Sequence, residues 1–225
     1  MSTLASHRRI VVGVDGSVNS LGAARWAAAV AARMNLPLHL LCAVDRQLFA
    51  YRGFDASGSS GWDGMLLAAS NAVLDEASTV VLANHPEITV SRESSSDFVA
   101  RALLDSSDHA RLLVVGQSGW GSLGSTLVGS TTQLVVDQAG CPVVVWKGPE
   151  NKEPDRGPVV VGVDGSELST RAVDESFEFA AAFGAPVIAV HTWSAAMTAG
   201  VFKIPVMLDS QAVAASEEAV LSESL

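Results

Sequence analysis

A glycine-rich stretch at residues 116–131 carries the strongest chemical signal in this chain. It reads GQSGWGSLGSTLVGST and follows the apolar run 112–115 directly. Glycine lets a backbone turn tightly and approach a ligand closely, and the first N–H groups of a helix favour phosphate. The spacing G-x2-G-x9-G-[S/T] therefore predicts a loop that holds the phosphates of a nucleotide. The alternative is a helix N-cap that follows a flexible loop.

Part of the same stretch is close to a second phosphate-binding pattern. Residues 124–131 nearly match G-x4-G-K-[S/T], but Ser130 stands where that pattern has lysine. A P-loop NTPase needs the lysine on the β- and γ-phosphates. The sequence therefore predicts at most slow hydrolysis, and it offers no candidate catalytic residue.

A second motif lies near the N-terminus, where the apolar run 10–14 stops at Asp15-Gly16-Ser17 before an alanine-rich segment. Such a pattern predicts a strand, a turn and a helix. Together with the 116–131 loop, the Gly13–Ser17 motif resembles the ATP-binding branch of the universal stress protein family, over residues 8–147. The resemblance implies the strand order 3-2-1-4-5. Ligands of such sheets bind where the strand order reverses, here between the first and fourth strands.

The resemblance also assigns roles to individual residues. It implies that Asp15 reaches the ribose or adenine end of ATP, that Gly13 and Val14 lie against the base, and that Ala43 pairs with the adenine edge through its main chain. The alternatives are a helix-capping role for Asp15 and ordinary strand roles for Val14 and Ala43. The full set of candidate nucleotide-binding residues is Gly13, Val14, Asp15, Ala43, Gly116, Gln117, Gly119, Trp120, Gly129, Ser130 and Thr131.

Three of the loop residues depart from the family pattern. Gln117 stands where many members carry serine, and Trp120 and Ser122 stand where arginine and glycine are frequent. Loss of a basic side chain is expected to weaken the grip on the triphosphate rather than to remove the site.

The N-terminal motif occurs twice. Gly162-Val163-Asp164-Gly165-Ser166 repeats Gly13–Ser17 at an offset of 149 residues (162 − 13), and Pro186 repeats Pro37 at the same offset (186 − 37). We expect a complete domain at 1–147, a charged, proline-containing linker at 148–157, and a partial second copy at 158–225. Because the glycine-rich loop occurs once in the sequence, we expect one bound nucleotide per chain.

Strand and helix patterns alternate along the chain, which is typical of a parallel sheet with helices on both faces. The expected strands of the first copy are 10–14, 39–44, 88–92, 112–115 and 142–146, its helices are 21–34, 63–83, 97–106 and 130–138, and 49–62 is a long loop. The second copy is expected to supply strands 159–163 and 187–193 and helices 168–183 and 208–221. The fold class is thus α/β, an open parallel five-stranded sheet followed by an incomplete copy of the same fold.

Composition excludes several other classes of protein. The chain has 225 residues and a net charge of −10, from 24 acidic and 14 basic side chains, without the basic stripe that nucleic-acid binding requires. It has no uninterrupted apolar run of about 18 residues, as a membrane span would need, and its N-terminus lacks the apolar stretch of a secretory signal. We therefore expect a cytoplasmic protein. The histidines show no metal-ligand spacing, and the two cysteines lie in apolar runs.

The sequence as a whole favours an ATP-binding regulatory module that acts through nucleotide-dependent conformation or association; whether Mg²⁺ accompanies the ATP stays open. One alternative is an adenylating-type enzyme, which would need a second pocket and acid, base or basic residues near the α-phosphate. Another is a module that binds no nucleotide and only dimerises. The uncharged strand 142–146 is expected to be an edge, and an uncharged edge invites pairing with another chain, so we expect a homo-oligomer.

Overall fold

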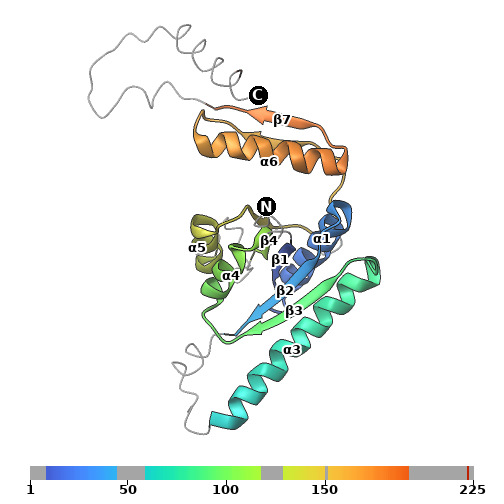
Figure 1. The fold of residues 1–225 in the computed structure, drawn as a ribbon, viewed down its shortest axis with the longest axis vertical. Coiled ribbons are helices and arrows are strands. Elements are labelled where there is room, and N and C mark those ends of the chain that lie inside the picture. The colour runs from blue at the N-terminus through green and yellow to red at the C-terminus, as the bar shows by residue number, and fades with distance from the viewer. Residues whose placement is uncertain (1–8, 45–58, 118–128, 150–151, 193–221, 223–225) are drawn as a thin grey trace, which may run out of the picture. The chain divides into compact units, whose positions relative to one another are not determined.

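Five parallel strands form the central sheet of the N-terminal unit, in the order β3-β2-β1-β4-β5. Figure 1 labels the first four of them. The computed structural model describes residues 9–44, 59–117, 129–149, 152–192 and 222. The strands are β1 (Arg9–Gly13), β2 (Leu38–Ala43), β3 (Val90–Ser95), β4 (Ala110–Gly116) and β5 (Val143–Trp146). This is the strand order expected from the sequence.

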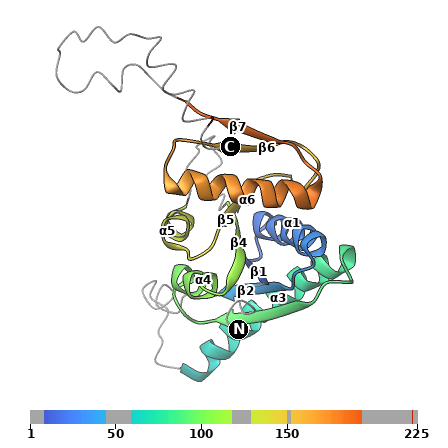
Figure 2. The ribbon, with the colours of Figure 1, turned by 45° about the horizontal axis from the view of Figure 1, so that its top comes forward.

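Four helices cover the two faces of this sheet. They are α1 (Val18–Met34), α3 (Ser59–Asn84), α4 (Val99–Ser107) and α5 (Ser130–Gln138). Helices α1 and α3 pack together on one face, and α4 and α5 pack together on the other (Figure 2). Because both faces are covered, the inner strands are apolar without alternation, and Ile10, Val11, Val12, Leu113 and Val114 are fully buried.

Helix α1 lies close to the sheet because its inner face is built from small side chains. Its alanines at 23, 24, 27, 28 and 31 are fully buried. The helix begins after Ser17, whose Oγ accepts a hydrogen bond from the backbone N–H of Ser20. It ends at Asn35, which adopts a left-handed conformation with a φ of 54°. These two residues fix the start and the end of the helix that follows β1.

Helix α3 and strand β3 differ most from the bounds expected for the first copy. Helix α3 begins at Ser59, four residues before the expected start at 63, so residues 59–62 belong to a helix and not to a loop. Strand β3 covers Val90–Ser95 rather than 88–92. Its polar second half pairs with β2, where Ser94 and Ser95 stand opposite Cys42 and Ala43. Backbone pairing holds this edge strand, so its alternation of polar and apolar residues was a poor guide to its ends.

The chain divides into two compact units between Pro154 and Asp155. The second unit contains β6 (Val159–Gly162), α6 (Glu167–Phe183) and β7 (Val187–Val190), and its two strands are parallel. Helix α6 packs on one face of the pair through Val173, against Val161 and Val163. Strand β7 ends at Val190, short of the expected 193, and the expected helix at 208–221 lies outside the described residues. The domain limits drawn from the repeat stay a prediction.

Candidate functional site

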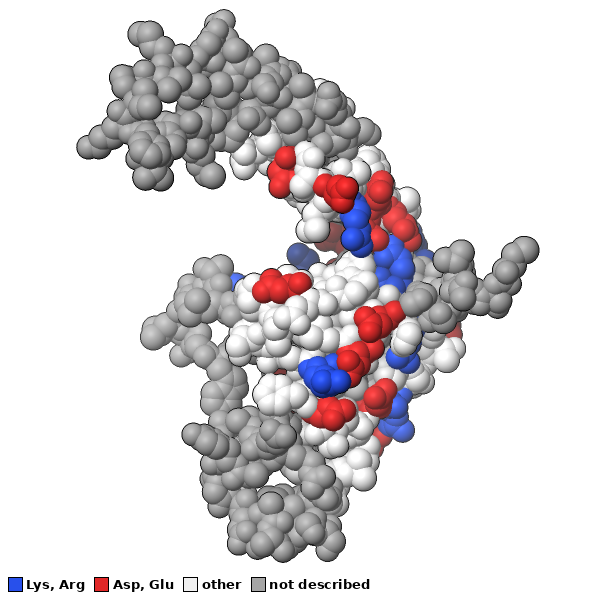
Figure 3. Space-filling view, turned by 60° about the vertical axis from the view of Figure 1, so that its left-hand side comes forward, with Lys and Arg blue, Asp and Glu red and all other residues white. Residues whose placement is uncertain are grey.

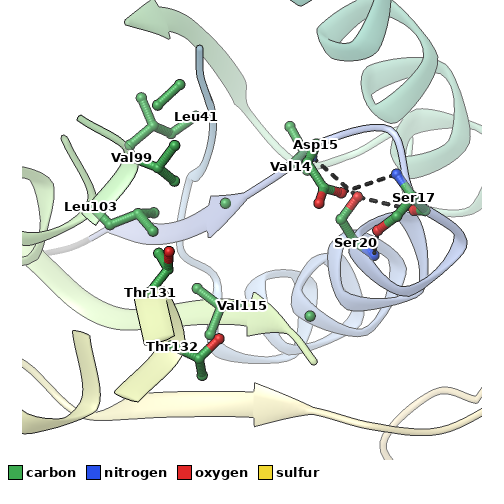
Figure 4. A pocket seen from close by; sticks show the side chains of 13 residues that line it. Val14, Asp15, Ser17, Ser20, Leu41, Val99, Leu103, Val115, Thr131 and Thr132 are labelled. Carbon is green, nitrogen blue, oxygen red and sulfur yellow. Dashed lines mark hydrogen bonds between the residues drawn. The ribbon is translucent and has the colours of Figure 1, made fainter. Parts of the chain in front are cut away.

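A cavity of about 270 Å³ lies at the carboxyl ends of β1 and β4, where the strand order of the sheet reverses (Figure 4). This is the place where open α/β sheets bind ligands. The lining residues are Gly13, Val14, Asp15, Ser17, Ser20, Leu41, Ala43, Val99, Leu103, Val115, Gly116, Thr131 and Thr132. They come from β1, β2, β4, α1, α4, α5 and the turns between them, so residues far apart in the sequence share one cavity.

Six of the eleven candidate residues line this cavity: Gly13, Val14, Asp15, Ala43, Gly116 and Thr131. Of the others, Gly129 and Ser130 form the N-cap and first residue of α5. Gln117 follows β4, and its backbone N–H donates to the carbonyl oxygen of Trp146 at 2.9 Å. Gly119 and Trp120 lie outside the described residues. The binding roles of all eleven stay a prediction.

The cavity also contains residues that the sequence did not single out. Leu41 and Val115 could have been found from strand periodicity, because Leu41 precedes Ala43 by two residues and Val115 pairs in register with Gly13. Val99 and Leu103 lie one turn apart on α4, which packs on the sheet. In the sequence such residues are indistinguishable from ordinary core positions, so nothing marked them as part of a site.

The turn between β1 and α1 places Asp15 at the cavity. Gly16 has a φ of 78°, a left-handed conformation that glycine adopts without strain. The Oδ1 of Asp15 accepts the Ser17 backbone N–H at 3.0 Å, and the Asp15 N–H donates to the Oγ of Ser20 at 3.2 Å. The N-cap of α1 is Ser17, so Asp15 does not have the capping role that was the alternative for it.

The surroundings of Asp15 keep its carboxylate ionised. Partial burial raises its pKa, but hydrogen bonds from Ser17 and Ser20 lower it by more, so the net pKa lies below the ordinary value of 3.8. At neutral pH the group is therefore a negatively charged hydrogen-bond acceptor. It can accept from the hydroxyl groups of a ribose, whereas it would repel a phosphate placed beside it.

The second unit repeats this turn closely. The Oδ1 of Asp164 accepts the Ser166 N–H at 3.0 Å, the Oγ of Ser166 accepts the Ser169 N–H at 3.1 Å, and Gly165 again has a φ of 78°. The hydrogen bonds of the Asp-Gly-Ser turn are thus a local property of that sequence. They do not by themselves indicate a ligand site, and the cavity beside Asp15 carries that part of the argument.

The N-terminus of α5 contributes the opposite wall of the cavity. Its N-cap, Gly129, makes no side-chain capping hydrogen bond, whereas serine hydroxyls cap α1 and α6. Thr131 and Thr132, in the first turn, both line the cavity. Uncapped N–H groups at the start of a helix favour an anion. This wall therefore suits phosphate, while Asp15 suits the sugar.

Charge and metal ligands are sparse around the site. Among the described lining residues, Asp15 is the only ionisable side chain, and the described part of the chain has no cluster of three His, Cys, Asp or Glu residues that could hold a metal. On the face shown in Figure 3, acidic and basic side chains of the described residues lie interspersed, without a continuous basic stripe.

The cysteines and the strand histidine are engaged in structure. Cys42 and Cys141 form no disulfide. Burial, followed by the charge of Asp15, raises the pKa of the Cys42 thiol to about 11. The buried ring of His39 lies 2.8 Å from the Oγ of Ser91 and 3.1 Å from a carboxylate oxygen of Glu93. Both ring nitrogens of His39, which lies within strand β2, therefore have a polar partner.

One described helix is long and apolar enough to cross a membrane by length and composition alone. It is the Gly64–Asn84 part of α3, of which 28% of the most apolar window is buried. The same helix packs against β2, β3 and α1. A core helix of a soluble domain passes the same test, so the finding is weak support for a membrane span.

Comparison with known proteins places the chain in a family. The sequence model of the universal stress protein family matches residues 6–147 and again 156–224. Universal stress protein Rv2005c of Mycobacterium tuberculosis is 34% identical over an alignment that covers 100% of this chain and 76% of that protein. The chain belongs to the universal stress protein family.

A solved structure agrees with the fold. The structural alignment with a universal stress protein from Archaeoglobus fulgidus DSM 4304 covers 96% of this chain and 74% of that protein, with a TM-score of 0.66 and 15% sequence identity. A universal stress protein solved in complex with cAMP is 26% identical to this chain. That alignment covers 63% of this chain and 98% of the cAMP-bound protein, with a TM-score of 0.46.

Proposed function

We propose that this chain is an ATP-binding regulatory module that acts through nucleotide-dependent conformation or association. The observation that carries the proposal is the meeting of two motifs, separated by 101 residues (116 − 15), in one cavity: Asp15 and Gly116 both line it. The Asp15 motif alone has a plain structural explanation, as the repeated turn at Asp164 shows. Their convergence on one cavity at the reversal of strand order is what favours a nucleotide.

The apolar part of the cavity suits the base. Leu41, Val99, Leu103 and Val115 lie around it, together with the small Ala43 (Figure 4). A flat heteroaromatic ring gains free energy by leaving water for such a surface. In the proposal these side chains hold the base, and Asp15, which lies across the cavity from Leu41, Val99 and Leu103 in Figure 4, accepts from the ribose.

The start of α5 takes the phosphates. Gly129, with no side chain to block the approach, precedes the N–H groups of Ser130 and Thr131. Charge-assisted hydrogen bonds from such backbone groups hold phosphate without a basic surface. An acidic chain with a net charge of −10 can bind ATP in this way.

The residue types favour regulation over catalysis in this proposal. Ser130 replaces the lysine that fast P-loop hydrolysis requires. An adenylating-type enzyme would place acid, base or basic groups near the α-phosphate, and the described lining residues offer Asp15 alone. We therefore propose at most slow hydrolysis of the bound ATP.

Mass spectrometry of small molecules released from freshly purified, denatured protein tests this proposal. ATP, or ADP left by slow turnover, should be released from the wild-type chain and be absent from a folded Gly129→Asp variant purified in parallel. Titration of the emptied protein with ATP, ADP, AMP, cAMP and GTP then ranks the nucleotides. Release of no nucleotide, together with no measurable affinity for any of the five, would favour the module that only dimerises.

A further inference from the structure

Asn19 links the two halves of the candidate site. It is the second residue of α1, and its Nδ2 donates a hydrogen bond of 2.7 Å to the backbone carbonyl oxygen of Gln117. The two residues are 98 apart in the sequence, and the bond is partly buried. Asn19 belongs to the helix that follows Asp15, whereas Gln117 is the second residue of the glycine-rich stretch.

The backbone of Gln117 is held through both its N–H and its carbonyl oxygen. Its N–H donates to the carbonyl oxygen of Trp146 on β5, and its carbonyl oxygen accepts from Asn19. Immediately before it, Gly116 lies against α1, since a Cβ built at 116 would stand 2.8 Å from the backbone carbonyl carbon and oxygen of Asn19. These contacts fix the position of the backbone at Gln117, directly after β4.

The second unit shows that the turn itself does not need this asparagine. The position equivalent to Asn19 is Leu168 (168 − 149 = 19), whose side chain is 78% exposed. The Asp164-Gly165-Ser166 turn and the serine cap of α6 nevertheless keep the hydrogen bonds of the first unit. The side-chain amide of Asn19 is therefore not required to form the start of the helix. Its hydrogen bond goes instead to Gln117, the residue that follows β4.

We propose that Asn19 is a positioning residue for phosphate binding, which holds the start of the glycine-rich loop in the orientation that the phosphates require. The inference rests on the proposed function of the site. It assigns to Asn19 an effect on the phosphates and none on the nucleoside, because its hydrogen bond ends on Gln117 and its side chain is absent from the lining of the cavity.

The test compares Asn19→Leu with the wild-type chain. Leucine branches at Cγ as asparagine does, lacks the amide donor and already stands at position 168. The dissociation constants of ATP and of adenosine are measured by calorimetry, and the exchange rate of the Gln117 amide is measured by NMR. Leu168→Ala serves as the control, because it alters the second residue of the equivalent helix. Asn19→Ala repeats the test without the leucine side chain.

Asn19→Leu and Asn19→Ala should weaken ATP binding by about fivefold to tenfold, the loss of one hydrogen bond, and leave adenosine within about twofold. The Gln117 amide should exchange faster in both variants, and Leu168→Ala should change neither reading. Equal losses for ATP and adenosine, or unchanged ATP affinity with an unchanged exchange rate, would overturn the inference while the proposed function stands. A wild-type chain that binds no nucleotide would overturn both.

Discussion

Gly116 at the end of β4 lies against the backbone of Asn19 and Ser20 at the start of α1. A Cβ at residue 116 would stand 2.8 Å from the carbonyl oxygen of Asn19 and 3.0 Å from the backbone nitrogen of Ser20. Both neighbours are backbone atoms and cannot rotate away as a side chain can. The glycine therefore permits the close approach that brings Asp15 and the glycine-rich stretch to one cavity.

Gly116→Ala should lower the free energy of unfolding by about 1–3 kcal/mol, the usual cost of forcing extra volume into a packed region. Denaturant unfolding followed by circular dichroism measures it. Gly64→Ala is the matched control in the same unit, because a Cβ there meets no atom within 4 Å. Within helix α3 that change should stabilise the protein by up to about 1 kcal/mol. Equal effects of the two substitutions would contradict the close approach.

Gly129→Asp should abolish ATP binding while the fold persists. The new carboxylate would repel the phosphates, and its side chain would block the approach to the N–H groups of α5. Calorimetry with ATP measures the loss, and circular dichroism checks the fold. Gly129→Asn is the matched control for size without charge, and it should retain more affinity than Gly129→Asp. Unchanged ATP affinity in a folded Gly129→Asp variant would remove α5 from the site.

The pKa of Asp15 sets the pH dependence of nucleoside binding. The folded-state pKa of Asp15 lies below 3.8, so its carboxylate is ionised at neutral pH. The contribution of the ionised carboxylate to nucleoside binding is lost only as the pH falls through this lowered pKa. Adenosine has no phosphate to titrate, so its affinity should stay constant between about pH 8 and about pH 5. A fall centred near about pH 6.5, where histidine titrates, would show that Asp15 is not the group that matters.

Strand β5 should mediate self-association. Among the described strands it pairs only with β4, so it forms one edge of the sheet, and the residues Val143, Val144 and Val145 are apolar and half-buried. Val144→Lys should weaken association by placing a charge on that edge. Sedimentation at micromolar concentration measures it, with Thr89→Lys, beside the opposite edge strand, as the control. A monomeric wild-type chain, or a Val144→Lys chain that associates unchanged, would refute this prediction.

Some elements of the fold could be predicted closely because one local cause dominates each of them. The bounds of α5, Ser130–Gln138, match the expectation because a glycine marks the start of the helix. The strands β1, β2 and β4 were found because burial on both faces makes them continuous apolar runs. The start of α3 was missed because Gly, Ser and Trp at residues 59–62 are typical of a loop, although the structure makes them helical.

In the candidate site, too, the residues set by a local cause could be predicted, and those placed by the packing of distant elements could not. Residues in the two motifs, such as Asp15 and Gly116, could be predicted because a turn and a close approach demand particular residue types. Val99 and Leu103 could not, because their place at the cavity depends on how α4 packs on the sheet. Asn19 escaped notice as well, since its bond to Gln117 spans 98 residues and no local pattern signals it.

The repeated turn offers a matched pair of variants for the central claim. Asp15 and Asp164 each accept a hydrogen bond from the backbone N–H of the serine two residues on, so replacing either by alanine removes the same bond from its turn. Asp15 lines the cavity at the ends of β1 and β4, and Asp164 is not among the residues that line it. Any difference between the two variants in nucleotide affinity therefore reports a contact with the ligand rather than damage to the turn.

Calorimetric titration of ATP into the wild-type, Asp15→Ala and Asp164→Ala chains is the most direct test of nucleotide binding at this site. The wild-type and Asp164→Ala chains should bind a single ATP per chain with equal affinity. Asp15→Ala should bind ATP about tenfold or more weakly, as expected for losing a charge-assisted hydrogen bond, with little change for inorganic triphosphate. Equal effects of the two substitutions on ATP affinity, or a wild-type chain that binds two nucleotides, would contradict the account.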